Sequence, residues 1–103
     1  TTGVSSHDRS LTIRKLLEAH ADDLARPGHI FPLISRDSLF ERQGHTEASI
    51  TLCRLAELKE VAVISELMND NGVMMNKEQA LSFARQHNLV VISIEQLLEY
   101  LKA

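Results

Sequence analysis

The sequence predicts an α/β fold, a mixed sheet with helices packed on it, and two observations support this prediction. Short runs rich in β-branched residues at 61–64 and 89–92 are bounded by polar residues, which is typical of buried strands. Stretches with helical periodicity and capping signals separate these runs. The alternation of helix and buried strand over residues 46–103 favours parallel pairing for some of the strands.

Four helices are predicted, each behind a residue suited to the N-cap position. The first covers residues 6–20 and the second runs to about residue 58. The last two carry a glutamine three residues after the cap, which predicts a capping box. The four predicted caps are Ser5, Thr46, Asn76 and Ser93.

The connections contain further strand and turn signals. Residues 30–34 form a short apolar run that Pro32 shifts toward a sheet edge or a bulge. Residues 39–40 are a possible short strand. The Asn71-Gly72 pair favours a type I′ hairpin, with residues 73–75 as the returning strand.

Composition sets the limits on function. A chain of 103 residues, 44% hydrophobic and 24% charged, fits one globular domain over residues 1–103. A net charge of −3 without a basic cluster argues against nucleic acid as a partner. No signal peptide and no long apolar run are visible, so we expect a cytoplasmic protein without a membrane partner. The chain starts at Thr1 without a Met, and we therefore expect a piece of a longer protein.

The strongest functional signal is the loop before the second helix. With Thr46 as the cap, the loop amides and the positive end of the helix point at one spot, which attracts an anion. Arg42 adds a fork-shaped donor suited to a phosphate, Gly44 lets the backbone approach closely, and Thr46 offers a hydroxyl. An ordinary capped helix with a few polar residues at its start is the alternative for so short a motif.

Other polar side chains extend this candidate site. His45 and Glu47 place an imidazole and a carboxylate beside the same pocket. Glu66 follows a predicted strand, at the strand end where ligands bind in open α/β sheets, and is a candidate base. His29 lies at the mouth of a strand, and Thr2 belongs to a second possible anion cradle. For each of these residues a plain structural role remains the alternative.

The familiar catalytic motifs are missing. The sequence contains no Gly-x-Ser-x-Gly, no P-loop and no Gly-x-Gly-x-x-Gly, and its five histidines lack zinc-type spacing. Four longer motifs do occur in order: TTGVSSHDR at residues 1–9, RPGHIFPL at 26–33, RQGHTEA at 42–48 and ELMNDNG at 66–72. Together they resemble the C-terminal half of 3,4-dihydroxy-2-butanone 4-phosphate synthase, and the closing stretch VVISI at 90–94 extends the resemblance.

The resemblance implies a partial dihydroxybutanone phosphate synthase fold and a lyase activity in riboflavin biosynthesis. The implied reaction converts D-ribulose 5-phosphate to L-3,4-dihydroxy-2-butanone 4-phosphate and formate, with Mg²⁺ or Mn²⁺ as the cofactor. The implied partners are the phosphosugar and a second subunit in a homodimer. Removal of a proton next to a carbonyl is the chemistry to be supported.

The resemblance also assigns roles to individual residues. The implied substrate-binding residues of the loop and the N-terminus are Thr2, Arg42, Gln43, Gly44 and Thr46, of which Arg42, Gly44 and Thr46 would hold the phosphate. His45 is the implied metal ligand, Glu66 the implied contact to the sugar and a catalytic group, and His29 a catalytic group that serves a neighbouring subunit's pocket.

One part of the family pattern is missing. The family's second metal ligand lies in an N-terminal acidic loop, Asp-Asp-Glu followed by Arg-Glu-Asn-Glu-Gly-Asp, and nothing in this sequence matches it. We therefore expect the 103 residues to be incomplete and inactive by themselves. The alternative is a non-catalytic module for phosphosugar binding or dimerisation that lacks the acidic metal loop.

Overall fold

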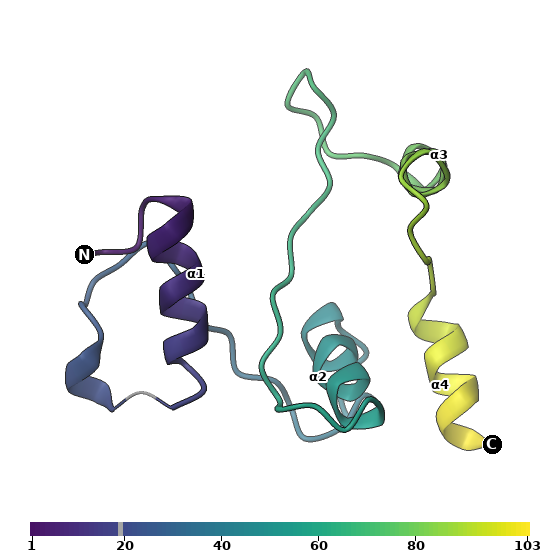
Figure 1. Cartoon of the computed structure of the whole chain (residues 1–103). Helices are drawn as coiled ribbons and strands as arrows, with labels where there is room; N and C mark the ends of the chain where they lie inside the picture. The colour runs from purple at the N-terminus through teal and green to yellow at the C-terminus, as the bar shows by residue number, and fades with distance from the viewer. Residues whose placement is uncertain (19) are drawn as a thin grey trace.

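The structure, a computed structural model, describes residues 1–18 and 20–103. Long extended segments connect its helices, and the two termini lie at opposite sides of the molecule (Figure 1). Within the described residues no strand forms, and the only β pairing is an isolated antiparallel bridge between Met68 and Met74. The elements are α1 (Ser6–Lys15), the 3-10 helix η1 (Ala21–Asp23), α2 (His45–Leu55), α3 (Lys77–Gln86) and α4 (Ile94–Lys102).

Three of the four predicted helix starts are confirmed. The Ser5 hydroxyl accepts a hydrogen bond from the Asp8 N–H at the start of α1. Asn76 and Ser93 each form a capping box with the glutamine three residues on. Helix α1 ends at Lys15, earlier than the predicted 6–20 range, whose residue 19 lies outside the described residues.

The predicted cap of α2 is wrong by two residues. Helix α2 begins at His45, and its N-cap is Gly44, which has no side chain to cap with. Thr46 is therefore the second residue of the helix and not its cap. As a result, no N-cap side chain accepts a hydrogen bond from the backbone N–H groups at the start of α2.

The predicted sheet is the part of the fold that the structure contradicts. Residues 30–34, 61–64 and 89–92 are extended but join no ladder, and the predicted strand at 39–40 is part of a turn. A strand needs a second extended segment as its partner, and among the described residues these runs form only local backbone hydrogen bonds, such as Leu89 N–H to the Ala84 carbonyl and Val61 N–H to the Lys59 carbonyl. The α/β prediction is thus right for the helices and wrong for the strands.

The predicted hairpin does form, with a different turn. The Gly72 N–H donates to the Asn69 carbonyl at 2.9 Å. A type I′ turn needs a positive φ at both Asn71 and Gly72, but only Gly72 has one, +86°. This is the pattern of a three-residue loop that ends in a left-handed glycine, not of a type I′ turn. The Met75 N–H donates to the Leu67 carbonyl, so residues 73–75 return antiparallel, as a single bridge and not as a strand.

A small core joins α2 to α4. The loop residue Leu39 is buried against two leucines of α4, and partly buried side chains from both helices surround them. The cluster consists of Leu39, Leu97 and Leu98, with Ala48, Ile94 and Leu101 packed around it. Leu39 belongs to the loop that carries Arg42, so this core fixes the base of the candidate site.

Much apolar surface remains uncovered. The accessible surface is 8574 Å², whereas a folded monomer of this mass exposes about 5,800 Å². The radius of gyration, 15.9 Å, likewise exceeds the roughly 13 Å of a packed domain of this length. Ile34 and Val90 in the extended runs are 96% and 91% exposed. None of the described helices has the length and apolar character needed to span a membrane.

Candidate functional site

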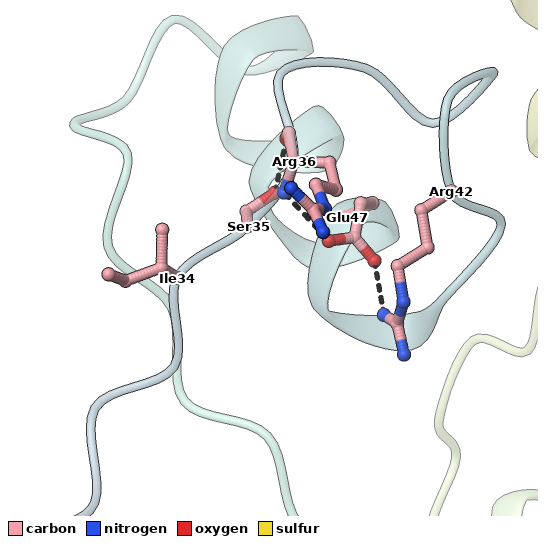
Figure 2. Close-up of a pocket in the computed structure, with 5 residues that line it drawn as sticks. All are labelled: Ile34, Ser35, Arg36, Arg42 and Glu47. Atoms are coloured by element: carbon pink, nitrogen blue, oxygen red, sulfur yellow. Dashed lines mark hydrogen bonds and ion pairs between the residues drawn. The ribbon is translucent and has the colours of Figure 1, made fainter.

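The start of α2 and the loop before it form a polar pocket of about 400 Å³ around a buried carboxylate. Glu47, the third residue of α2, is only 2% exposed. One of its oxygens accepts from Arg42 Nη1 at 2.6 Å, and the other accepts from the Arg36 backbone N–H at 2.8 Å (Figure 2). Ile34 and Ser35 complete the lining. The carboxylate thereby connects two parts of the loop to the helix.

These hydrogen bonds hold the pKa of Glu47 below its ordinary value. The N–H of Arg36 has the largest effect and the guanidinium of Arg42 adds to it, while burial opposes both. Glu47 is therefore a carboxylate near neutral pH, and Arg42 is fixed beside a permanent negative charge.

Gly44 leaves the space in which Arg42 and Glu47 meet. Its φ of −100° is open to any residue, so backbone conformation does not demand a glycine. A methyl group at this position would collide with Arg42 Nη1 and would lie 2.6 Å from Glu47 Oε1. Absence of a side chain at residue 44 thus lets the guanidinium lie directly over the start of α2.

The remaining loop residues lie around the open helix start. Gln43 and His45 are exposed, and Thr46 is half-buried. Within the described part of the chain, no acceptor binds the backbone N–H groups of His45 or Thr46. A cation and free N–H groups at one helix start are an arrangement that binds phosphate.

A second, larger groove of about 650 Å³ lies between the extended segments 29–33 and 60–65. His29 and Thr46 both line it, and so does Ser65, the neighbour of Glu66. Residues of α1 and α2 supply other parts of its wall. The groove brings together three of the regions that the sequence predicted to be functional.

The ring of His29 is oriented by the backbone of Thr2. The His29 N–H donates to the Thr2 carbonyl at 2.8 Å, and ring Nδ1 lies 3.2 Å from the same oxygen. A carbonyl can only accept, so this contact is a hydrogen bond when Nδ1 carries the proton. In that tautomer Nε2 is left as a proton acceptor.

Not every predicted residue joins these groups. The side chain of Glu66 is exposed, and no contact of the described residues links it to Arg42. Among those same residues, no three His, Cys, Asp or Glu side chains gather as a metal ion requires. His45 can therefore supply one ligand, but the described residues do not complete a site around it.

Sequence analysis missed how the loop at residues 35–38 is attached. Arg54 at the end of α2 donates to the Asp37 carbonyl at 2.6 Å and to Glu60 at 2.7 Å. This pairing lowers the pKa of Glu60. The bond from Arg54 to the Asp37 carbonyl and the bond from the Arg36 N–H to Glu47 together fasten the loop to both ends of α2. The one sequence signal for the Arg36 contact was the carboxylate of Glu47 in the first turn of the predicted helix.

The comparisons with known proteins agree with one another. The family model for 3,4-dihydroxy-2-butanone 4-phosphate synthase matches residues 1–100. The synthase of Hamiltonella defensa is 48% identical, over 97% of this chain and 47% of its own length. The crystal structure of the Candida albicans synthase superposes with a TM-score of 0.90 at 43% identity, covering 98% of this chain and 54% of that one.

A further solved synthase, in complex with two magnesium ions, has a TM-score of 0.83 and 34% identity over 99% of this chain and 54% of its own. The chain thus spans about half the length of these relatives. The match nevertheless runs through every helix described above, and the resemblance in four motifs is confirmed. This chain belongs to the 3,4-dihydroxy-2-butanone 4-phosphate synthase family.

Proposed function

We propose that this chain supplies the phosphate-binding part of a lyase that converts D-ribulose 5-phosphate to L-3,4-dihydroxy-2-butanone 4-phosphate and formate in riboflavin biosynthesis. Membership of the synthase family supports the reaction. The observation that carries the role of this chain is the open start of α2, with Arg42 fixed above it.

The phosphate of the substrate binds where charge and free donors converge. Arg42 is 59% exposed although Nη1 is bound to Glu47, so its other N–H groups face outward. The unpaired N–H groups at the start of α2 add further donors, Thr46 adds a hydroxyl, and Gln43 adds an amide. Gly44 leaves room for the phosphoryl oxygens to approach the backbone.

The sugar then extends from the phosphate into the larger groove. Thr46 belongs to both regions, because it follows the loop and also lines the groove with His29 and Ser65. Of the groups in this region able to accept a proton from a carbon next to a carbonyl, we assign the role to His29 Nε2 and the Glu66 carboxylate, because the Glu60 carboxylate that also lines the groove is paired with Arg54. Thr2 orients His29, and the exposed ring also suits a role in the pocket of a second subunit of a homodimer.

A divalent metal belongs to the activity of this family, since one of the solved synthases holds two magnesium ions. His45 is exposed at the start of α2 and would supply one ligand to Mg²⁺ or Mn²⁺. A hard cation of this kind takes several oxygen ligands, and the described residues do not gather them. The ion therefore depends on ligands from outside this set of residues.

The uncovered surface fits this partial role. The extended segments 30–34 and 61–64 lie on both sides of the groove without joining a strand ladder, and both carry exposed apolar side chains. Residues 1–103 then form one part of a longer domain, whose other part pairs with these segments and contributes the missing ligands. The absence of a spanning helix among the described residues is compatible with the cytoplasmic location that we propose.

Titration of the chain with ribulose 5-phosphate tests the proposal. We expect saturable binding that weakens by about 10- to 100-fold in Arg42→Ala, the loss of a charge-assisted contact. Arg85→Ala is the matched control, because Arg85 is exposed in the last turn of α3 and lines neither the pocket nor the larger groove. Absence of binding, or an equal loss in both variants, would contradict the assignment.

Formate release tests the partial role. The purified chain should release none, and addition of the unmatched segment of the Hamiltonella defensa relative should restore turnover. Turnover by the chain alone would refute its incompleteness.

A further inference from the structure

Glu47 has a contact pattern that phosphate binding alone does not explain. It is the most deeply buried charged side chain among the described residues, and both of its oxygens are in use. A negative charge beside the expected phosphate opposes binding, and burial of a carboxylate is unfavourable unless it is well paired. A carboxylate at this position must therefore have a role that offsets the repulsion of the phosphate and the cost of burial.

We propose that Glu47 is a positioning residue that orients Arg42 toward the phosphate and fixes the loop at residue 36 against α2. This role rests on the proposed function. The carboxylate accepts a hydrogen bond from Nη1 of Arg42, and the arginine side chain is still 59% exposed. A long, flexible arginine is thereby restrained in one direction before the substrate arrives, which reduces the entropy lost on binding.

A carboxylate is the group that this geometry requires. Glu47 accepts from two donors on different chain segments, the Arg36 N–H at 2.8 Å and Arg42 Nη1 at 2.6 Å. A glutamine of the same length has one acceptor oxygen, and its NH₂ group would face the second donor. Substitution by Gln must therefore break one of the two contacts without changing the volume of the side chain.

The chain offers a matched control in a second ion pair. Arg54 and Glu60 also pair at 2.7 Å, but the two side chains are 42% and 51% exposed and lie outside the phosphate loop. Glu60→Gln removes the same charge and the same kind of partner as Glu47→Gln. A difference between the two variants then reports on the position of Glu47 and not on net charge.

The test measures inorganic phosphate and ribulose 5-phosphate binding together with the NMR signals of the arginine side chains in the full chain. We expect Glu47→Gln to weaken both ligands by about tenfold and to shift the Nε–Hε signal of Arg42. Glu60→Gln should shift the Arg54 signal and leave the affinity for inorganic phosphate unchanged; ribulose 5-phosphate is not compared in this variant, because Glu60 lines the larger groove. In an Arg42→Ala background, Glu47→Gln should change affinity by less than about twofold, because its effect passes through Arg42.

Each outcome decides the matter. Tighter or unchanged phosphate binding in Glu47→Gln, or a full second loss in the double variant, overturns the positioning role while the proposed function stands. Failure of the wild-type chain to bind either ligand removes the proposed function, and with it this role. If Glu47→Gln loses helical circular dichroism, Glu47→Asp gives the answer, since it keeps the charge but is too short to reach both donors; equal affinity in that variant also overturns the role.

Discussion

Helices α2 and α4 pack against each other, yet their N-termini are built in opposite ways. Helix α4 closes its own start: the Ser93 hydroxyl accepts the Gln96 N–H at 3.1 Å, and the Gln96 side chain accepts the Ser93 N–H at 2.8 Å. Helix α2 has Gly44 at the N-cap and Glu47 at the position equivalent to Gln96. The Glu47 side chain forms no capping box with Gly44 and instead binds Arg36 and Arg42.

The difference shows how one helix position can serve stability or binding. A capping box satisfies the N–H groups of the N-cap residue and of the third helical residue internally and so leaves fewer donors for a ligand. At α2 the side chain that could have closed the box draws in a cation, so the N–H groups remain available beside a guanidinium. The helix start that is less well capped is therefore the one suited to an anion.

The largest expected effect comes from separating the two helices. Leu39→Ala removes the buried side chain between the α2 loop and α4, and we expect a loss of about 2–5 kcal/mol in the free energy of unfolding. Leu58→Ala is the control, because that leucine is exposed. Urea unfolding followed by circular dichroism measures both, and equal midpoints would show that Leu39 does not anchor α4.

Closing the α2 start with a carboxylate should weaken the phosphate binding that we propose for it. Gly44→Asp places a charged cap over the free N–H groups and displaces Arg42, so we expect phosphate affinity to fall on the order of 100-fold. Ser93→Asp introduces the same group at the α4 cap and should leave the affinity unchanged. Isothermal titration with phosphate compares them; retained binding in Gly44→Asp would place the anion site elsewhere.

Removal of the hydroxyls at the two starts should affect stability unequally. Ser93→Ala deletes a working cap and should cost about 1 kcal/mol in unfolding free energy. Thr46→Ala deletes a hydroxyl that caps nothing, and its effect should stay within about 0.5 kcal/mol. Denaturant melts of both variants measure this contrast, and a larger loss in Thr46→Ala would restore Thr46 as a cap.

The same contrast explains what the sequence could predict. Caps at Ser5, Asn76 and Ser93 depend on contacts within three residues, so local pattern was enough to find them. At α2 the rule chose Thr46, since a hydroxyl is a better cap than glycine, whereas Gly44 is set by the space that Arg42 and Glu47 occupy. That requirement arises from packing and has no local signature.

Strand prediction failed for a related reason. The β-branched residues at 61–64 and 89–92 favour extended backbone, and extended backbone is what they adopt. Pairing, however, depends on a second segment, and the described residues contain none for these runs. The bond from Arg36 to Glu47 likewise joins residues eleven apart through a loop, which no periodicity reveals. Candidate residues could be predicted from the sequence, but their contacts could not.

The smallest expected effect is a dependence of stability on acid. The pKa of Glu47 is lower in the folded chain than its ordinary value of 4.5, so its ionised form favours folding above that value. This contribution is lost as the pH falls through the lowered folded pKa, when the carboxyl group takes up a proton and releases Arg36 and Arg42. Glu60 has a lowered pKa as well, and the same sign applies.

Urea midpoints between about pH 7 and pH 3 should therefore fall less steeply in Glu47→Gln than in the wild-type chain. Glu60→Gln should flatten the profile to a smaller extent, because its ion pair is exposed to solvent and screened. Parallel profiles for the wild type and Glu47→Gln would mean that the buried carboxylate does not stabilise the α2 start. Helix α2 would then owe its position to the Leu39 core and to the Arg54 contacts, and the contrast with α4 would reduce to a difference in capping.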